Sequence, residues 1–146
     1  MFAALRKRLT DALDDNLGRY TADKDLLEGA MAACAMMAHG DGTLEEQERK
    51  KTADFVRRHP SMRHFDGSEA GRLFLQFCSE FDFDHGMGVS ACLKQIGEVR
   101  GDEKRTLVMQ LALAIGKSDG EFEPGEKLAA QKICDQLGLS RSEFDL

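Results

Sequence analysis

Two windows of the sequence can be laid over one another without a gap, and this repeat constrains the fold more than any other feature. They are "MMAHGDGTLEEQE" at residues 36–48 and "AIGKSDGEFEPGE" at residues 114–126. Each window ends an apolar stretch with an Asp-Gly pair and continues into glutamates. Glycine permits tight loops, and acidic side chains favour the first turn of a helix. The repeat therefore predicts one unit twice, at residues 24–58 and 103–138: an apolar helix, a DG loop and an amphipathic helix.

The whole chain predicts an all-α fold. It has two prolines in 146 residues, its apolar residues recur at helical spacing, and it has no strand-like alternation of any length. Capping boxes are expected at Thr43 with Glu46 and at Ser140 with Glu143. We expect one domain over residues 1–146, a compact bundle of about seven helices with two pseudo-symmetric helical-hairpin halves. The helices are expected at about 2–13, 23–39, 44–59, 68–81, 85–100, 103–117 and 124–138, with a short turn after Ser140.

Composition limits the classes of function. With 42% apolar and 32% charged residues, the chain has the composition of a soluble globular protein. Its apolar runs are too short to cross a bilayer and its first residues turn charged too early for a signal peptide, so no transmembrane segment and a cytoplasmic location are predicted. A formal charge of −6 argues against a general nucleic-acid binder.

The four cysteines predict buried thiols. They are Cys34, Cys78, Cys92 and Cys134, and none has the spacing of a CxxC pair or a Cys/His zinc site. Cysteines among apolar residues behave as small hydrophobes, and burial leaves little nucleophilic thiolate. The sequence therefore favours core packing over a zinc site or a disulfide framework.

Acidic residues are concentrated in the two DG windows, and two explanations remain open. Eight of the 26 acidic residues lie within residues 41–48 and 119–126. One explanation is helix-end chemistry, in which carboxylates complement the positive end of a helix dipole and stabilise turns. The other is a site for a divalent cation, because carboxylates held close together repel one another unless a cation neutralises them. The candidate ligands are Asp41, Glu45, Glu48, Asp119, Glu123 and Glu126.

An all-oxygen site favours Ca²⁺, Mg²⁺ or Mn²⁺ over Zn²⁺. The loops are not EF-hands, because counting from Asp119 places Pro124 at the sixth position and Ala130 at the twelfth. High-affinity calcium binding of the EF-hand type is therefore not predicted.

These windows, with "MAACAMMA" and "LALAIGKSDG" before them, resemble the TerB-like family of tellurite-resistance and stress-response proteins. The resemblance extends from Asp23 to the C-terminus. It implies an all-α fold of about seven helices in two related halves, with metal-binding acidic loops. Glu45 and Glu123 stand where the family often has a shorter polar residue. The strongest matches are Asp41, Gly42, Glu48, Asp119, Gly120 and Glu126.

The same resemblance implies partners among the other proteins of the tellurite-resistance system, acting at the inner face of the membrane. We therefore expect a non-enzymatic cytoplasmic adaptor or sensor, peripheral to the inner membrane. The competing hypothesis is a purely structural interaction module whose DG loops only connect helices. An oxyanion-reducing or hydrolytic enzyme would need a redox dithiol or a nucleophile-base pair, and the sequence displays neither.

Two further features have alternative explanations. His39 lies two residues before Asp41, and a histidine interacting with a helix C-terminus is favoured over an acid-base pair. The segment "ERKKTADFVRRHPSMRH" at residues 48–64 is basic. A solvated helix face explains it, and a docking surface for an acidic partner or anionic lipid headgroups is the alternative. Nucleic acid is less favoured, because no aromatic residues interleave with the charges.

Overall fold

Helices make up most of the chain. The computed structural model describes residues 11–42, 44–116 and 123–146, and within these ranges it contains helices and no strand. Residues 11–17 are the described part of the first helix. The other α-helices are α2 (Lys24–Ala38), α3 (Glu46–Arg58), α4 (Gly67–Ser79), α5 (His85–Gly97), α6 (Asp102–Gly116) and α7 (Pro124–Gln136). Short 3-10 helices are η1 (Gly18–Tyr20), η2 (Pro60–Met62) and η3 (Arg141–Phe144). The predicted all-α bundle of about seven helices is confirmed.

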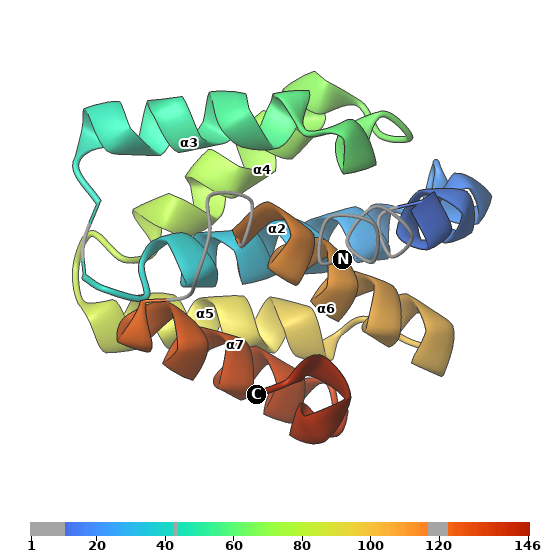
Figure 1. The fold of residues 1–146 in the computed structure, drawn as a ribbon. Helices are drawn as coiled ribbons and strands as arrows, with labels where there is room; N and C mark the ends of the chain where they lie inside the picture. Colours follow the sequence, from blue (N-terminus) through green and yellow to red (C-terminus); the bar gives the residue numbers. More distant parts are fainter. Residues whose placement is uncertain (1–10, 43, 117–122) are drawn as a thin grey trace.

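α2 is the central helix of the bundle. It contacts α4, α5, α6 and α7, and Figure 1 shows these helices arranged around it. Side chains on nearly all its sides are buried, which explains why the sequence is apolar there throughout rather than on one stripe. Asp23 caps its first turn, because its Oδ1 accepts a hydrogen bond from the Leu26 amide at 2.9 Å.

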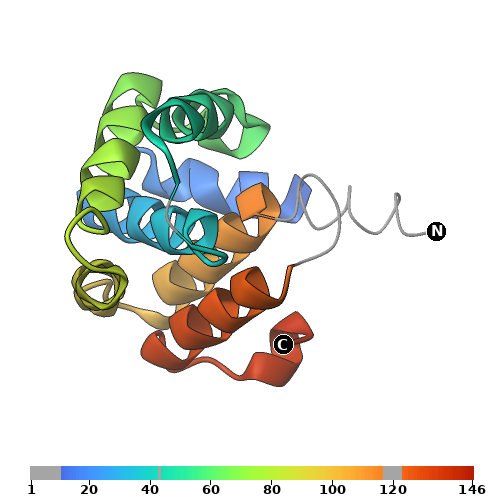
Figure 2. The same cartoon turned by 90° about the vertical axis from the view of Figure 1, so that its left-hand side faces the viewer.

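α3 packs mainly against α4 and η2. Ala53 and Val56 are its only buried residues, so the helix covers the bundle with a narrow apolar face. Figure 2 shows α3 and α4 together at the top of the bundle, above α2. The first predicted hairpin is therefore looser than its sequence pattern indicated.

Arg105 joins the ends of three helices on the other side of the bundle. Its guanidinium donates to the carbonyl oxygens of Val99 at 2.8 Å, Leu137 at 2.9 Å and Gly97 at 3.1 Å. These carbonyls lie at or just beyond the C-termini of α5 and α7, where a positive charge is favourable. This residue fixes α6 between α5 and α7.

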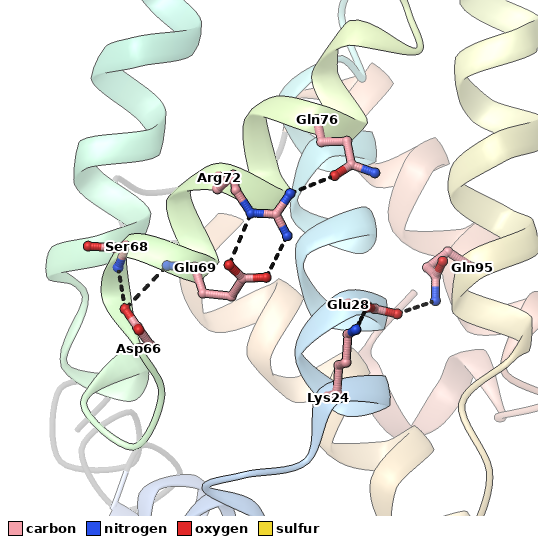
Figure 3. A network of polar contacts seen from close by, with 8 residues as sticks. All are labelled: Lys24, Glu28, Asp66, Ser68, Glu69, Arg72, Gln76 and Gln95. Carbon is pink, nitrogen blue, oxygen red and sulfur yellow. Dashed lines mark hydrogen bonds and ion pairs between the residues drawn. The ribbon is translucent and has the colours of Figure 1, made fainter.

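Polar contacts on the α4 side are satisfied within the chain. Figure 3 shows Glu28 of α2 accepting a hydrogen bond from Gln95 of α5 at 3.2 Å. On α4, Arg72 pairs with Glu69 and donates to Gln76. The Gln95 bond connects α5 to α2, whereas the Arg72 bonds stay within α4 and hold its surface side chains in one arrangement.

Several local predictions need correction. α3 begins at Glu46 with Glu45 as its N-cap, so the predicted capping box of Thr43 and Glu46 is wrong; Thr43 itself lies outside the described residues. Ser140 is the N-cap of η3, but its side chain makes no capping hydrogen bond. The predicted helix at residues 2–13 falls mostly outside the described residues.

Candidate functional site

The first DG loop contacts the first turn of α7, although the two segments are far apart in sequence. Asp41 Oδ1 accepts a hydrogen bond from the Gly125 amide at 3.1 Å, across 84 positions of chain. The backbones also touch, because a Cβ atom built on Gly125 would lie 2.1 Å from the Gly40 carbonyl oxygen. Figure 1 shows the end of α2 and the start of α7 at the same end of the bundle. We call this contact of Gly40 and Asp41 with Gly125 the loop junction.

The first turn of α7 contributes two more of the predicted carboxylates to the loop junction. Glu126 accepts a hydrogen bond from the Glu123 amide at 3.2 Å, and Pro124 is the first residue of the helix, as predicted. Asp41 satisfies the next free amide, that of Gly125. Amides in the first turn of a helix have no partner within the helix, so both carboxylates act as helix caps.

The remaining predicted ligands lie elsewhere. Glu45 is the N-cap of α3 without a side-chain capping bond, and Glu45 and Glu48 are both exposed at the start of that helix. Asp119 lies outside the described residues. Across residues 11–42, 44–116 and 123–146, no three His, Cys, Asp or Glu side chains gather closely enough to hold a metal ion. The structure thus places Asp41, Glu123 and Glu126 near one helix end, without bringing the three close enough to hold a metal ion, and places Glu45 and Glu48 at another.

A cleft of about 360 Å³ lies between α3 and the helices beneath it. Met37 and Ala38 of α2 and Ile115 of α6 line its floor, and Phe55 and Lys51 of α3 line its wall. Glu126 borders it at the loop junction. The cleft is the space left because α3 packs on α4 rather than directly on α2.

His39 is a buried, neutral histidine. It is fully buried, its ring stacks on Phe81 with centroids 4.2 Å apart, and its Nδ1 is 2.9 Å from the Ala35 carbonyl oxygen. A carbonyl only accepts hydrogen bonds, so Nδ1 carries the proton. Burial lowers the pKa of His39. His39 therefore ends α2 by packing and hydrogen bonding, and its position gives no support to an acid-base pair with Asp41.

The predicted burial of the four thiols is confirmed. Burial raises the pKa of Cys34, Cys78 and Cys92 to about 12. Burial also raises the pKa of Cys134, whose Sγ donates to the Leu139 carbonyl oxygen at 3.4 Å. At neutral pH these groups are thiols, which are poor nucleophiles and poor ligands for soft elements.

Most of the basic residues of segment 48–64 are paired within the chain. Arg49 contacts Asp82 at 2.5 Å and Lys50 contacts Glu46 at 3.5 Å. Arg57 pairs with Asp54 and Arg63 with Asp14. Among the described residues, Lys51 and Arg58 have no ion-pair partner. The docking surface for an acidic partner or anionic lipid headgroups, which the sequence left as an alternative, is therefore reduced to these two residues.

Sequence reasoning missed the glycine contact of the loop junction. Neither Gly40 nor Gly125 was assigned a role beyond its place in the two repeated windows. The available signal was a glycine in the first turn of α7, because glycine disfavours helix by about 1 kcal/mol relative to alanine and calls for a packing reason.

Comparison with known proteins points to one family. A family described as "Tellurite resistance protein TerB" matches residues 27–146. A protein named "Tellurium resistance protein TerB", from Alcaligenes sp, is 28% identical over 106 residues, covering 73% of this chain and 84% of that protein. No solved structure gives a significant match. No helix within the described ranges is both long and apolar enough to cross a membrane.

Proposed function

Because the chain belongs to the TerB family of tellurite resistance proteins, we propose that it contributes to tellurite resistance as a non-enzymatic adaptor or sensor. The loop junction is the functional element of this proposal. It couples two helix pairs through a single carboxylate, Asp41. A ligand that changes the contacts of Asp41 changes the cap of α7 at the same time.

The ligand proposed for the loop junction is a divalent cation, Ca²⁺, Mg²⁺ or Mn²⁺, bound weakly. The observation that carries this proposal is the hydrogen bond from Gly125 to Asp41, with Glu123 and Glu126 in the same helical turn. Carboxylate oxygens are the ligands that these cations take. A cation that draws Asp41 away from Gly125 removes a capping bond and loosens the start of α7, so occupancy is transmitted to a helix.

The proposal is tested by NMR titration of chelator-stripped protein with Ca²⁺, Mg²⁺ and Mn²⁺. Saturable movement of the Gly125 and Gly42 amide signals is expected for Ca²⁺ or Mg²⁺, with line broadening for paramagnetic Mn²⁺. Asp41→Asn should abolish the response. Asp84→Asn is the matched control, since Asp84 caps α5 through the Gly86 amide at 3.2 Å. Signals that stay fixed up to millimolar cation would reject the cation proposal.

A specific observation also favours the competing proposal of a purely structural interaction module. Asp41 and Glu126 already accept hydrogen bonds from backbone amides, which is sufficient reason for two of the acidic residues to be there. This alternative predicts no change of melting temperature on adding cation. Asp41→Ala combined with Asp119→Ala would then lower the melting temperature equally in calcium and in chelator.

The proposed partners are other proteins of the tellurite-resistance system, met by the chain in the cytoplasm at the inner face of the membrane. No surface residue is assigned to them here, because most cations of segment 48–64 are already paired. The test is co-purification of tagged protein with the system's other components, with and without divalent cation. Cation-dependent recovery supports the sensor, cation-independent recovery supports the structural module, and no recovery rejects both.

The absence of catalysis is part of the proposal and has its own test. Purified protein is incubated with tellurite and a reductant, with and without thiol-blocking reagent. The raised pKa of the buried thiols predicts no reduction above the protein-free rate. Tellurite reduction that thiol blocking abolishes would make the chain an enzyme.

A further inference from the structure

The α4–α5 connection presents an unusually exposed aromatic side chain. Phe83 is 88% exposed, and Met87 beside it is 55% exposed. Both neighbours of Phe83 are fixed, because Asp82 pairs with Arg49 and Asp84 accepts a hydrogen bond from the Gly86 amide. Exposed apolar side chains held in place are characteristic of contact sites. With the exposed acids Glu80, Asp82 and Asp84, this connection forms what we call the acidic knob.

A second surface has the opposite charge. Phe55 lines the cleft beside α3 and is 44% exposed. Lys51 lies four residues before Phe55, and Arg58 lies three residues after it. This spacing places all three on one face of α3. Neither cation has an ion-pair partner among the described residues. We call the cleft with these two cations the basic cleft. Among the described residues that line it, Glu126 is the acidic one, and it lies at the loop junction, away from Arg58.

We propose that the acidic knob of one copy of this chain docks in the basic cleft of a second copy. Phe83 would enter the cleft beside Phe55. The exposed acids Glu80 and Asp84 would then face the two cations, while Asp82 stays paired with Arg49. Size permits this, since a cavity of about 150 Å³ accepts benzene and the cleft measures about 360 Å³. A second copy is the occupant argued for because one sequence carries both an exposed aromatic ringed by acids and an apolar cleft flanked by cations.

The acidic knob and the basic cleft lie on different parts of the molecule, and this determines the kind of assembly that they can form. The acidic knob lies in the α4–α5 connection, on the side of the molecule away from α7 in Figure 2, whereas the basic cleft is bordered by α7. A contact between different patches is heterologous and leaves one free knob and one free cleft at the ends. Association is therefore open-ended, it grows with concentration, and it weakens with salt because its charges are exposed.

Sedimentation velocity of the whole chain over a concentration series tests the proposal. We expect the wild-type sedimentation coefficient to rise with concentration at low salt and to fall towards the monomer value at high salt. Phe83→Ser and, separately, Lys51→Glu/Arg58→Glu should each stay monomeric. Leu128→Ser is the control, because Leu128 is 53% exposed on α7 and belongs to neither surface; it should behave like the wild type. Circular dichroism confirms that each variant folds.

A mixing experiment separates this contact from any other. Phe83→Ser keeps an intact cleft, and Lys51→Glu/Arg58→Glu keeps an intact knob. An equimolar mixture should reach the sedimentation coefficient of a dimer and go no further, because each variant supplies only one working surface. The proposal is overturned by a wild type that stays monomeric up to about millimolar concentration, the weak limit of such contacts. It is also overturned by Phe83→Ser associating normally, or by a mixture that remains monomeric.

Discussion

The unit formed by α2 and α3 and the unit formed by α6 and α7 share one sequence pattern but differ in how their second helix is held. α7 buries Ala129, Ala130, Ile133 and Cys134 and contacts α2, α5 and α6. α3 buries only Ala53 and Val56 and packs on α4, leaving a cleft above α2. A shared sequence pattern thus does not fix how closely the second helix packs; the apolar content of that helix does.

The first turns of α3 and α7 also differ, and that of α7 is again the more firmly held. α7 begins with Pro124 and Gly125, and it is capped by Glu126 of its own first turn and by Asp41 of the first loop. The aligned positions in α3 are Glu46 and Gln47, and its N-cap residue Glu45 makes no side-chain capping bond. The first loop therefore stabilises the start of the second unit's helix more than that of its own.

The largest difference in the free energy of unfolding is expected between shortening an apolar side chain in α7 and shortening one in α3. Ile133→Ala in α7 removes a fully buried side chain and should cost about 2–5 kcal/mol. Phe55→Ala in α3 removes one that is nearly half exposed, and about 1 kcal/mol or less is expected. Urea unfolding followed by circular dichroism measures both. Equal losses would show that α3 is held as tightly as α7, and the comparison would fail.

A methyl group at the loop junction should have the next largest effect. Gly125→Ala would place its Cβ 2.1 Å from the Gly40 carbonyl oxygen and 2.3 Å from Asp41 Oδ1, so the loops must separate. Such overpacking costs about 1–3 kcal/mol. Gly86→Ala in the first turn of α5 is the matched control, because its nearest neighbour would be 3.6 Å away. A Gly125→Ala variant as stable as this control would mean that the loops separate without cost.

The sequence was sufficient to predict much of the fold. The uniformly apolar stretch before His39 identified the central helix, and Pro124 marked the first residue of α7, because both signals are local. The partner of α3 was not predictable in this way. An amphipathic stripe shows that a helix covers something, but it does not say whether α2 or α4 lies beneath it.

The candidate site was predicted only in part, for a related reason. Asp41, Glu123 and Glu126 were singled out from their pattern, but the contact between their segments was not, because it depends on a close backbone approach of Gly40 and Gly125. That contact joins segments distant in sequence and breaks the repeat, since Ser118 and Gln47 occupy the aligned positions. A repeat implies equivalence, whereas the junction arises from two positions at which the copies differ.

Removing one carboxylate from the start of each helix tests the same difference at a smaller scale: Asp41 acts on α7 and Glu45 precedes α3. Asp41→Ala leaves the Gly125 amide without its acceptor and should cost about 0.5–2 kcal/mol, the usual effect of losing a helix cap. Glu45→Ala in the first unit removes no capping bond, and a change within about 0.5 kcal/mol is expected, as for other surface substitutions. Thermal and urea unfolding in chelator provide the measurement, so that cation binding cannot contribute. A Glu45→Ala loss as large as that of Asp41→Ala would indicate that carboxylates stabilise the starts of α3 and α7 alike.

The smallest effect is expected from a thiol in the first unit at alkaline pH. Burial raises the pKa of Cys34 to about 12 from an ordinary value of 9.0, so near pH 9 the unfolded chain releases this proton and the folded chain keeps it. Stability is therefore complete below pH 9 and declines as pH rises towards 12, with a loss of about 0.4 kcal/mol per such thiol at pH 9. Urea unfolding under reducing conditions at pH 7, 8 and 9 should show a shallower decline in Cys34→Ala than in the wild type. An unchanged decline would mean that the Cys34 thiol ionises as readily in the folded protein as in the unfolded one. Water would then reach this side chain of α2 from the cleft.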